Sequence, residues 1–93
     1  MKRPLLRSSA FVRAAQKVIK KYPQNAIDLE SALELLKADA LHPRLRTHKL
    51  KGELKDSWAC SAGYDLRIVF RFVQYEGSEA ILLESVGTHD EVY

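Results

Sequence analysis

The strongest pattern in the chain is a strict alternation of apolar and polar positions between residues 66 and 73. It predicts an extended strand whose inward face carries Leu66, Ile68, Phe70 and Phe72. The other face begins at Arg67 and alternates arginine with valine. Weaker strand patterns occupy residues 57–62 and 80–86, and a turn at residues 76–78 makes the last two strands an antiparallel hairpin.

Two earlier segments have the three- and four-residue spacing of helices. Ser8 or Ser9 is expected to cap the first helix, which runs to about Lys21 and ends before Pro23. Its apolar stripe comprises Phe11, Ala15, Val18 and Tyr22. The second helix spans about residues 26–38, and its stripe comprises Ala26, Leu29, Leu33, Leu36 and Ala40. A connection this short predicts an antiparallel helical hairpin.

The order of these elements predicts the fold class. Residues 4–7 are expected to form an edge strand, because Pro4 cannot donate to a sheet ladder. The polar segment 41–55 is expected to be a loop. The chain is therefore predicted to be a single α+β domain over residues 1–93, with order β-α-α-β-β-β and an antiparallel sheet packed on one face by the hairpin.

Size and cysteine content narrow the class of protein. With 93 residues the chain can build one core without disulfides, and its single cysteine, Cys60, cannot form an intramolecular bridge. Both facts fit a reducing, cytoplasmic compartment. No apolar run has the length of a signal sequence or a membrane span, so no membrane partner is expected.

The net charge of +3 hides an uneven distribution. Residues 1–55 carry thirteen Lys/Arg and five Asp/Glu, or +8, whereas residues 56–93 carry two and seven, or −5. This asymmetry favours a basic surface that meets a polyanion or an acidic partner. The alternative is that the cations only solvate the helix faces.

The C-terminal stretch, LLESVGTHDEVY from residue 82, is the best candidate for chemistry. It reads as a strand that ends at Gly87 and then exposes Thr88, His89 and Tyr93. A strand holds the residues at its end rigidly, while the following loop exposes them. An imidazole at this point can carry a proton near neutral pH.

Three segments resemble the RelE/ParE toxin superfamily: HKLKG at residues 48–52, AGYDLRIVF at 62–70 and ESVGTHDEVY at 84–93. The HxLKG and GTH elements look most like its YafQ-type ribonuclease branch. The resemblance implies the fold deduced above and the toxin of a type II toxin–antitoxin pair. Such a toxin cleaves mRNA in the ribosomal A site, contacts rRNA, uses no metal or cofactor and is neutralised by a cognate antitoxin that wraps it.

The resemblance also implies catalytic residues. His89 matches the histidine of GTH and His48 that of HxLKG, so these two would serve as acid and base. Arg67 follows the Gly-Tyr turn and is expected to contact phosphate, and Tyr93 matches the aromatic residue of the family ending. Asp65 lies near an acidic position of the branch, although this turn has one extra residue. Without a metal, RNA cleavage requires such a base, an acid and a cation.

Five basic residues are expected to position phosphates rather than react: Lys49, Lys51, Arg44, Arg46 and Lys55. The chain also departs from the branch. Cys60 or Ser61 stands where the branch has a further histidine, and Ser85 where it has an arginine, so the catalytic set is thinner. An acidic or amphipathic antitoxin segment is expected along the helices and the 44–55 loop.

Other functions stay open at this point. His42, His48 and His89 could bind zinc, but they lack a recognised ligand spacing and a cysteine pair. His42 before Pro43 reads better as a turn residue. A ParE-type inhibitor of DNA gyrase would share the architecture without needing the histidine pair. A toxin that has lost catalysis but still binds its antitoxin would also fit.

Overall fold

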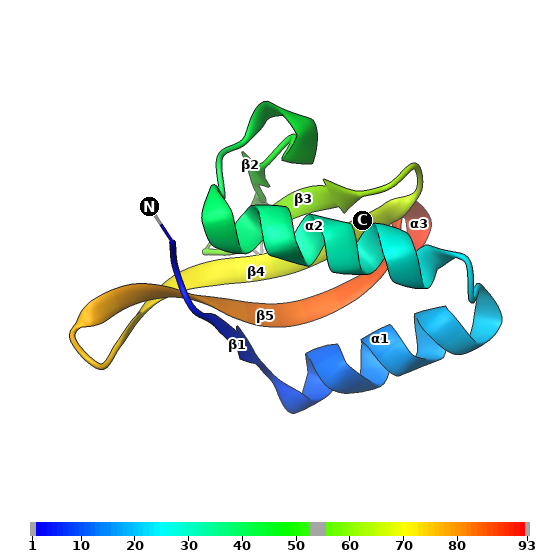
Figure 1. Ribbon diagram of the computed structural model, residues 1–93, viewed down its shortest axis with the longest axis horizontal. Helices are drawn as coiled ribbons and strands as arrows, with labels where there is room; N and C mark the ends of the chain where they lie inside the picture. The colour runs from blue at the N-terminus through cyan, green and yellow to red at the C-terminus, as the bar shows by residue number, and fades with distance from the viewer. Residues whose placement is uncertain (1, 53–55, 93) are drawn as a thin grey trace.

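The computed structural model describes residues 2–52 and 56–92. A short strand and two long helices come first, and the other four strands of a five-stranded sheet and a short C-terminal helix follow (Figure 1). The elements are β1 (Leu5–Arg7), α1 (Ser9–Lys21), α2 (Asn25–Ala38), the 3₁₀ turn η1 (Pro43–Leu45), β2 (His48–Lys49), β3 (Trp58–Ala62), β4 (Leu66–Tyr75), β5 (Ser78–Thr88) and α3 (His89–Val92). The predicted α+β class and the order of the main elements are confirmed.

The sheet has the strand order β1-β5-β4-β3-β2. Neighbouring strands are antiparallel except β1, which pairs in parallel with residues 81–83 of β5. The edge position of β1 is as predicted, but its direction makes the sheet mixed. A parallel pair needs a long connection, and here the rest of the domain lies between the two strands.

The core lies between one face of the sheet and the two helices. The predicted strand face is buried, with Leu66, Ile68 and Phe70 at most 1% exposed and Phe72 packed against them. From α2 the residues Leu29, Leu33 and Leu36 meet this face, and from α1 Phe11 and Val18. Both predicted apolar stripes are thus confirmed except at Tyr22 and Ala26, which are only partly buried and lie outside the core cluster.

One residue of β5 has no partner in β4. Val69 pairs with Ser85 and Phe70 pairs with Leu83, which leaves Glu84 as a bulge. A bulge changes which residues face each side of the sheet. Because of it, Leu83 and Val86 both face the core despite their spacing of three.

We call the sheet face opposite the helices the open face. The register places Ala59, Ser61, Arg67, Val69 and Arg71 on it, since side chains alternate along each strand. Besides η1, two short elements lie within segments predicted as loops. One is β2, which extends this sheet at its edge, and the other is α3, which follows β5 directly.

Ser8, rather than Ser9, caps α1. Its hydroxyl oxygen accepts a hydrogen bond from the backbone N–H of Phe11 at 3.0 Å and lies 3.4 Å from the carbonyl oxygen of Glu84. Ser8→Ala should therefore lower the free energy of unfolding by about 1 kcal/mol, measured by urea denaturation. Ser9→Ala removes an exposed hydroxyl inside the helix and is the matched control, with almost no loss expected. Equal effects would contradict the cap.

Candidate active site and nucleic-acid interface

A small apolar cluster on the open face joins the two segments that carry the candidate histidines. It consists of Leu50, Ala59 and Val69, with Val92 packed against them. Leu50 comes two residues after His48, and Val92 three residues after His89. The segments are far apart in sequence, yet both contribute to the cluster that includes Val69 of the central strand β4. The structure therefore brings both histidines to the rim of one cluster.

His48 lies at the sheet edge in β2, opposite Ala59 of β3, so the register places it on the open face. Its ring is exposed, and Nδ1 is 3.0 Å from the carbonyl oxygen of Arg46. A carbonyl oxygen only accepts, so this bond requires the proton on Nδ1. In the neutral ring, Nε2 is then the nitrogen with a lone pair.

His89 begins α3 immediately beyond the end of β5 and is exposed. Its backbone N–H donates to the carbonyl oxygen of Asp65 at 3.1 Å, which ties it to the turn between β3 and β4. Two residues earlier in β5, Gly87 is the cross-strand partner of Arg67. Asp65, Arg67 and His89 are thus gathered at one end of the β4–β5 pair.

Arg67 is half-buried on the open face between Ser61 of β3 and Gly87 of β5. Its Nη1 donates to the carbonyl oxygen of Leu66 at 2.9 Å. His48 is level with Val69 along the strands, because both pair with Ala59 of β3. It lies two strand spacings from β4, about 10 Å, on the side away from β5. Arg67 and His89 therefore approach the cluster from one side and His48 from the other.

Cys60 points into the core and is fully buried. Burial raises the pKa of its thiol to about 12, although the nearby positive charge of Arg67 opposes the shift. Of the two neighbours Cys60 and Ser61, only Ser61 shares the open face with Arg67.

The predicted phosphate-binding cations do not form one patch. Lys49 pairs with Trp58, whose ring packs on the core, so Lys49 and His48 lie on opposite faces. Arg46 is exposed in a left-handed conformation after η1, and Lys51 is exposed beyond β2. Lys55 and the catalytic candidate Tyr93 lie outside the described residues.

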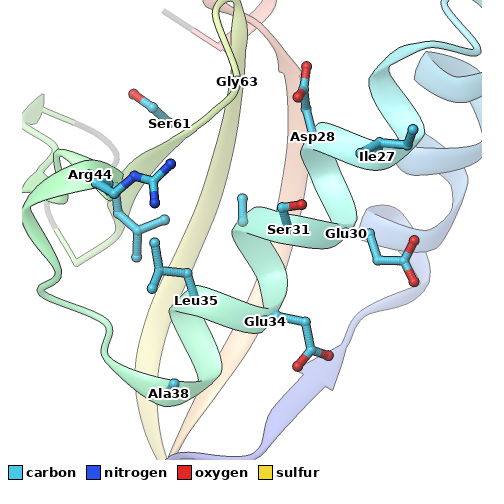
Figure 2. A pocket seen from close by; sticks show the side chains of 12 residues that line it. Ile27, Asp28, Glu30, Ser31, Glu34, Leu35, Ala38, Arg44, Ser61 and Gly63 are labelled. Atoms are coloured by element: carbon cyan, nitrogen blue, oxygen red, sulfur yellow. The ribbon is translucent and has the colours of Figure 1, made fainter.

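Arg44 reaches from η1 into a groove beside α2 (Figure 2). This groove has a volume of about 830 Å³, and its α2 wall carries Asp28, Glu30 and Glu34. Three carboxylates against one arginine repel a polyanion. Figure 2 shows Asp28 beside Gly63, at the turn that leads into β4. This groove is therefore a poor site for RNA.

His42 caps η1, because its Nδ1 accepts a hydrogen bond from the backbone N–H of Arg44 at 3.1 Å. This confirms the interpretation as a turn residue. No three His, Cys, Asp or Glu residues of ranges 2–52 and 56–92 are grouped as metal ligands. No helix in the described part of the chain is long and apolar enough to cross a membrane.

The family comparison identifies the chain. Residues 3–93 match the model of the family described as "Bacterial toxin of type II toxin-antitoxin system, YafQ". The chain belongs to the YafQ family. It is a YafQ-like toxin of the RelE/ParE superfamily, as the three sequence segments indicated. No curated protein matches it.

Solved structures share the YafQ fold over nearly the whole chain. YafQ from Escherichia coli BL21(DE3) is 17% identical with a TM-score of 0.77, and each chain is covered to 99%. YafQ in the E. coli DinJ–YafQ complex has the same identity and coverages and a TM-score of 0.76. A YoeB/ParE toxin from Agrobacterium tumefaciens is 12% identical with a TM-score of 0.74, covering 92% of this chain and 98% of its own.

The sequence analysis missed a polar network in this YafQ-like chain. Ser57, 1% exposed, donates from its hydroxyl to Oε1 of Glu84 at 2.6 Å. The buried Nε of Arg71 lies 3.3 Å from Oε2 of Glu84, and although this is an ion pair, Nε makes no hydrogen bond. The bulged residue thus spans β4 and ties β5 to the start of β3.

The network also reaches the His48 segment, because the backbone N–H of Leu50 donates to the carbonyl oxygen of Ser57 at 2.9 Å. The sequence signal for the bulge is the apolar spacing of Ile81, Leu83 and Val86, which breaks strict alternation. The signal for the cluster is a valine, Val69, between two arginines on an outward face.

Ser57→Ala should lower the free energy of unfolding by about 1 to 2 kcal/mol, because it leaves a half-buried carboxylate without its hydrogen bond. Chemical denaturation measures the loss. Ser61→Ala, in the same strand but without a recorded hydrogen bond among the described residues, is the control and should change stability by less than about 0.5 kcal/mol. A neutral Ser57→Ala would show that solvent replaces the bond.

Cys60 should resist alkylation in the native protein. With its pKa raised to about 12 by burial, the thiol is protonated at pH 8 and out of reach of iodoacetamide. Mass spectrometry should show no adduct under native conditions and one adduct in denaturant. Rapid modification of the folded protein would show that the core around β3 opens readily.

Proposed function

We propose that this YafQ-family toxin is a ribosome-dependent mRNA endoribonuclease that acts in the cytoplasm by metal-free acid–base catalysis. The observation that carries the proposal is the packing of Leu50 and Val92 in one apolar cluster, together with Ala59 and Val69. It brings the segments that carry His48 and His89 to the part of the sheet face on which Arg67 lies. Two histidines and an arginine can supply the base, the acid and the charge stabilisation that RNA cleavage needs.

His48 is proposed as the base. The bond from its Nδ1 to the carbonyl oxygen of Arg46 leaves the lone pair on Nε2, where it can take the proton of a ribose 2′-OH. His89 is proposed as the acid that protonates the departing 5′-oxygen. Arg67 stabilises the negative charge of the phosphorane. The products are a 2′,3′-cyclic phosphate and a 5′-OH end.

Two further residues keep supporting roles in this proposal. Tyr93 follows α3 in sequence and is proposed to stack on a base of the mRNA or to assist proton transfer. Asp65 acts first through its backbone carbonyl, which holds the N–H of His89. The substitutions at Ser61 and Ser85 leave Arg67 as the cation on this part of the open face, so its contribution should be correspondingly large.

The partner is proposed to be a cognate antitoxin. Membership of a type II toxin family implies one, and the solved complex of E. coli DinJ with YafQ shows such a pair on this fold. Arg46 and Lys51 are exposed on the segment that carries His48, so mRNA and rRNA are the proposed nucleic-acid partners.

The test compares His89→Ala and His48→Ala with the unchanged protein on ribosomes programmed with one mRNA. Mapping of the mRNA ends should show cleavage by the unchanged protein. Because proton transfer contributes ~10²–10⁴-fold, each substitution should slow cleavage at least about a hundredfold. His42→Ala is the matched control, since His42 only caps η1.

Three outcomes decide the matter. Loss in both histidine variants with an active His42→Ala supports the proposed pair. Cleavage that survives His89→Ala keeps the nuclease but removes His89 from its chemistry. If the folded, unchanged protein leaves the mRNA intact, the endoribonuclease proposal is wrong.

A further inference from the structure

A second groove runs between α1 and the end of β5, apart from the groove beside α2. It has a volume of about 480 Å³. Figure 1 shows α1 alongside β5, with α3 near the same end of the sheet. The groove is lined on the helix side by Ala14, Lys17, Val18, Lys21 and Tyr22. On the sheet side it is lined by Val69, residues 84–87 and Val92.

The helix wall of this groove is cationic. Lys17 and Lys21 are exposed and one helical turn apart, which places their Cβ atoms about 6 Å from each other. The chain has no acid before Asp28, and no described carboxylate forms an ion pair with either lysine. The one carboxylate among the lining residues, Glu84, is engaged by Ser57 and Arg71. The groove therefore attracts an anion.

The rest of the lining suits the faces of nucleobases. Tyr22 offers an aromatic ring at the end of the helix wall, and Nζ of Lys21 lies 5.4 Å from its centroid. Val86 and Val92 add apolar surface on the other side. A cationic track beside aromatic and apolar surface is the arrangement that binds single-stranded nucleic acid.

The groove also begins at the candidate active site. Gly87 lines it, is the cross-strand partner of Arg67 and precedes His89 by two residues. Val92 belongs both to this lining and to the cluster that holds the histidine segments. A strand whose phosphate meets Arg67 can thus continue directly between α1 and β5.

We infer that the groove between α1 and β5 binds the single-stranded RNA that flanks the cleaved phosphate, with Lys17 and Lys21 on successive phosphates and Tyr22 against a base. This inference rests on the proposed function for the identity of the nucleic acid. It assigns RNA binding to α1, whereas the groove beside α2, with its three carboxylates, repels RNA.

The experiment measures binding rather than cleavage. Fluorescence anisotropy follows a short single-stranded RNA that carries 2′-O-methyl groups, which block attack by the 2′-oxygen. The variants are Lys17→Ala/Lys21→Ala and, as matched control, Arg13→Ala/Lys20→Ala. Both pairs remove two charges from α1, one of them in its last turn, but Arg13 and Lys20 do not line the groove. Circular dichroism verifies that each variant is folded.

The variant Lys17→Ala/Lys21→Ala, called the groove pair, should bind the RNA roughly tenfold or more weakly at 0.1 M salt. The slope of log K against log salt concentration should become shallower by about 1.4, as expected when two contacts to the phosphates of a single strand are lost. The control pair should change both much less. Equal losses in the two pairs, no loss in the groove pair, or no RNA binding by the unchanged protein would overturn the inference. So would a groove pair that keeps RNA but loses the co-expressed antitoxin.

The outcome is separable from that of the nuclease assay. If the unchanged protein cleaves no mRNA on ribosomes but only the groove pair weakens RNA binding, RNA binding in the groove is supported and the catalytic proposal is wrong. If cleavage is seen and the groove and control variants bind RNA equally, the catalytic proposal is supported and the inference of RNA binding in the groove is wrong.

Discussion

The arrangement of the candidate site depends on the packing of Leu50 and Val92 against Val69 and Ala59. A helix of four residues such as α3 has no stability of its own, and a two-residue strand such as β2 has little. Burial of a leucine or valine side chain contributes about 1.5–3 kcal/mol when it is complete, which is enough to hold such short segments. The apolar cluster on an otherwise polar face thus fixes both histidines relative to β4.

The bulge at Glu84 is the second constraint on the position of the histidines. One unpaired residue shifts the alternation of side chains between the two faces of β5. Without it, Ser85 would face the core and Val86 the open face. With it, Val86 packs in the core and Gly87 faces Arg67, two residues before His89. The bulged carboxylate then crosses β4 to Ser57, whose carbonyl oxygen holds Leu50. The same local irregularity therefore sets the position of His89 and braces the segment of His48.

Much of this fold could be predicted from the sequence because its signals are local. The alternation at residues 66–73, the two helical stripes and the stop at Pro23 each act within a few residues. Three features could not be predicted, because each exists only through contacts with distant residues: the parallel direction of β1, the short strand β2 and the short helix α3. For the site, the resemblance gave the residue types, while the cluster at Val69 and the Ser57–Glu84–Arg71 network required the register of the sheet.

The uneven distribution of charge along the sequence does not correspond to a basic half and an acidic half of the folded domain. The basic N-terminal part and the acidic C-terminal part of the chain are not separated in space, since Arg3 forms an ion pair with Glu79. The two long helices differ in charge: α1 carries only cations, whereas α2 carries Asp28, Glu30 and Glu34. An acidic antitoxin segment along both helices would be attracted by α1 and repelled by the first turns of α2. We therefore expect such an antitoxin segment to bind on the α1 side, where the segment would compete with RNA for Lys17 and Lys21.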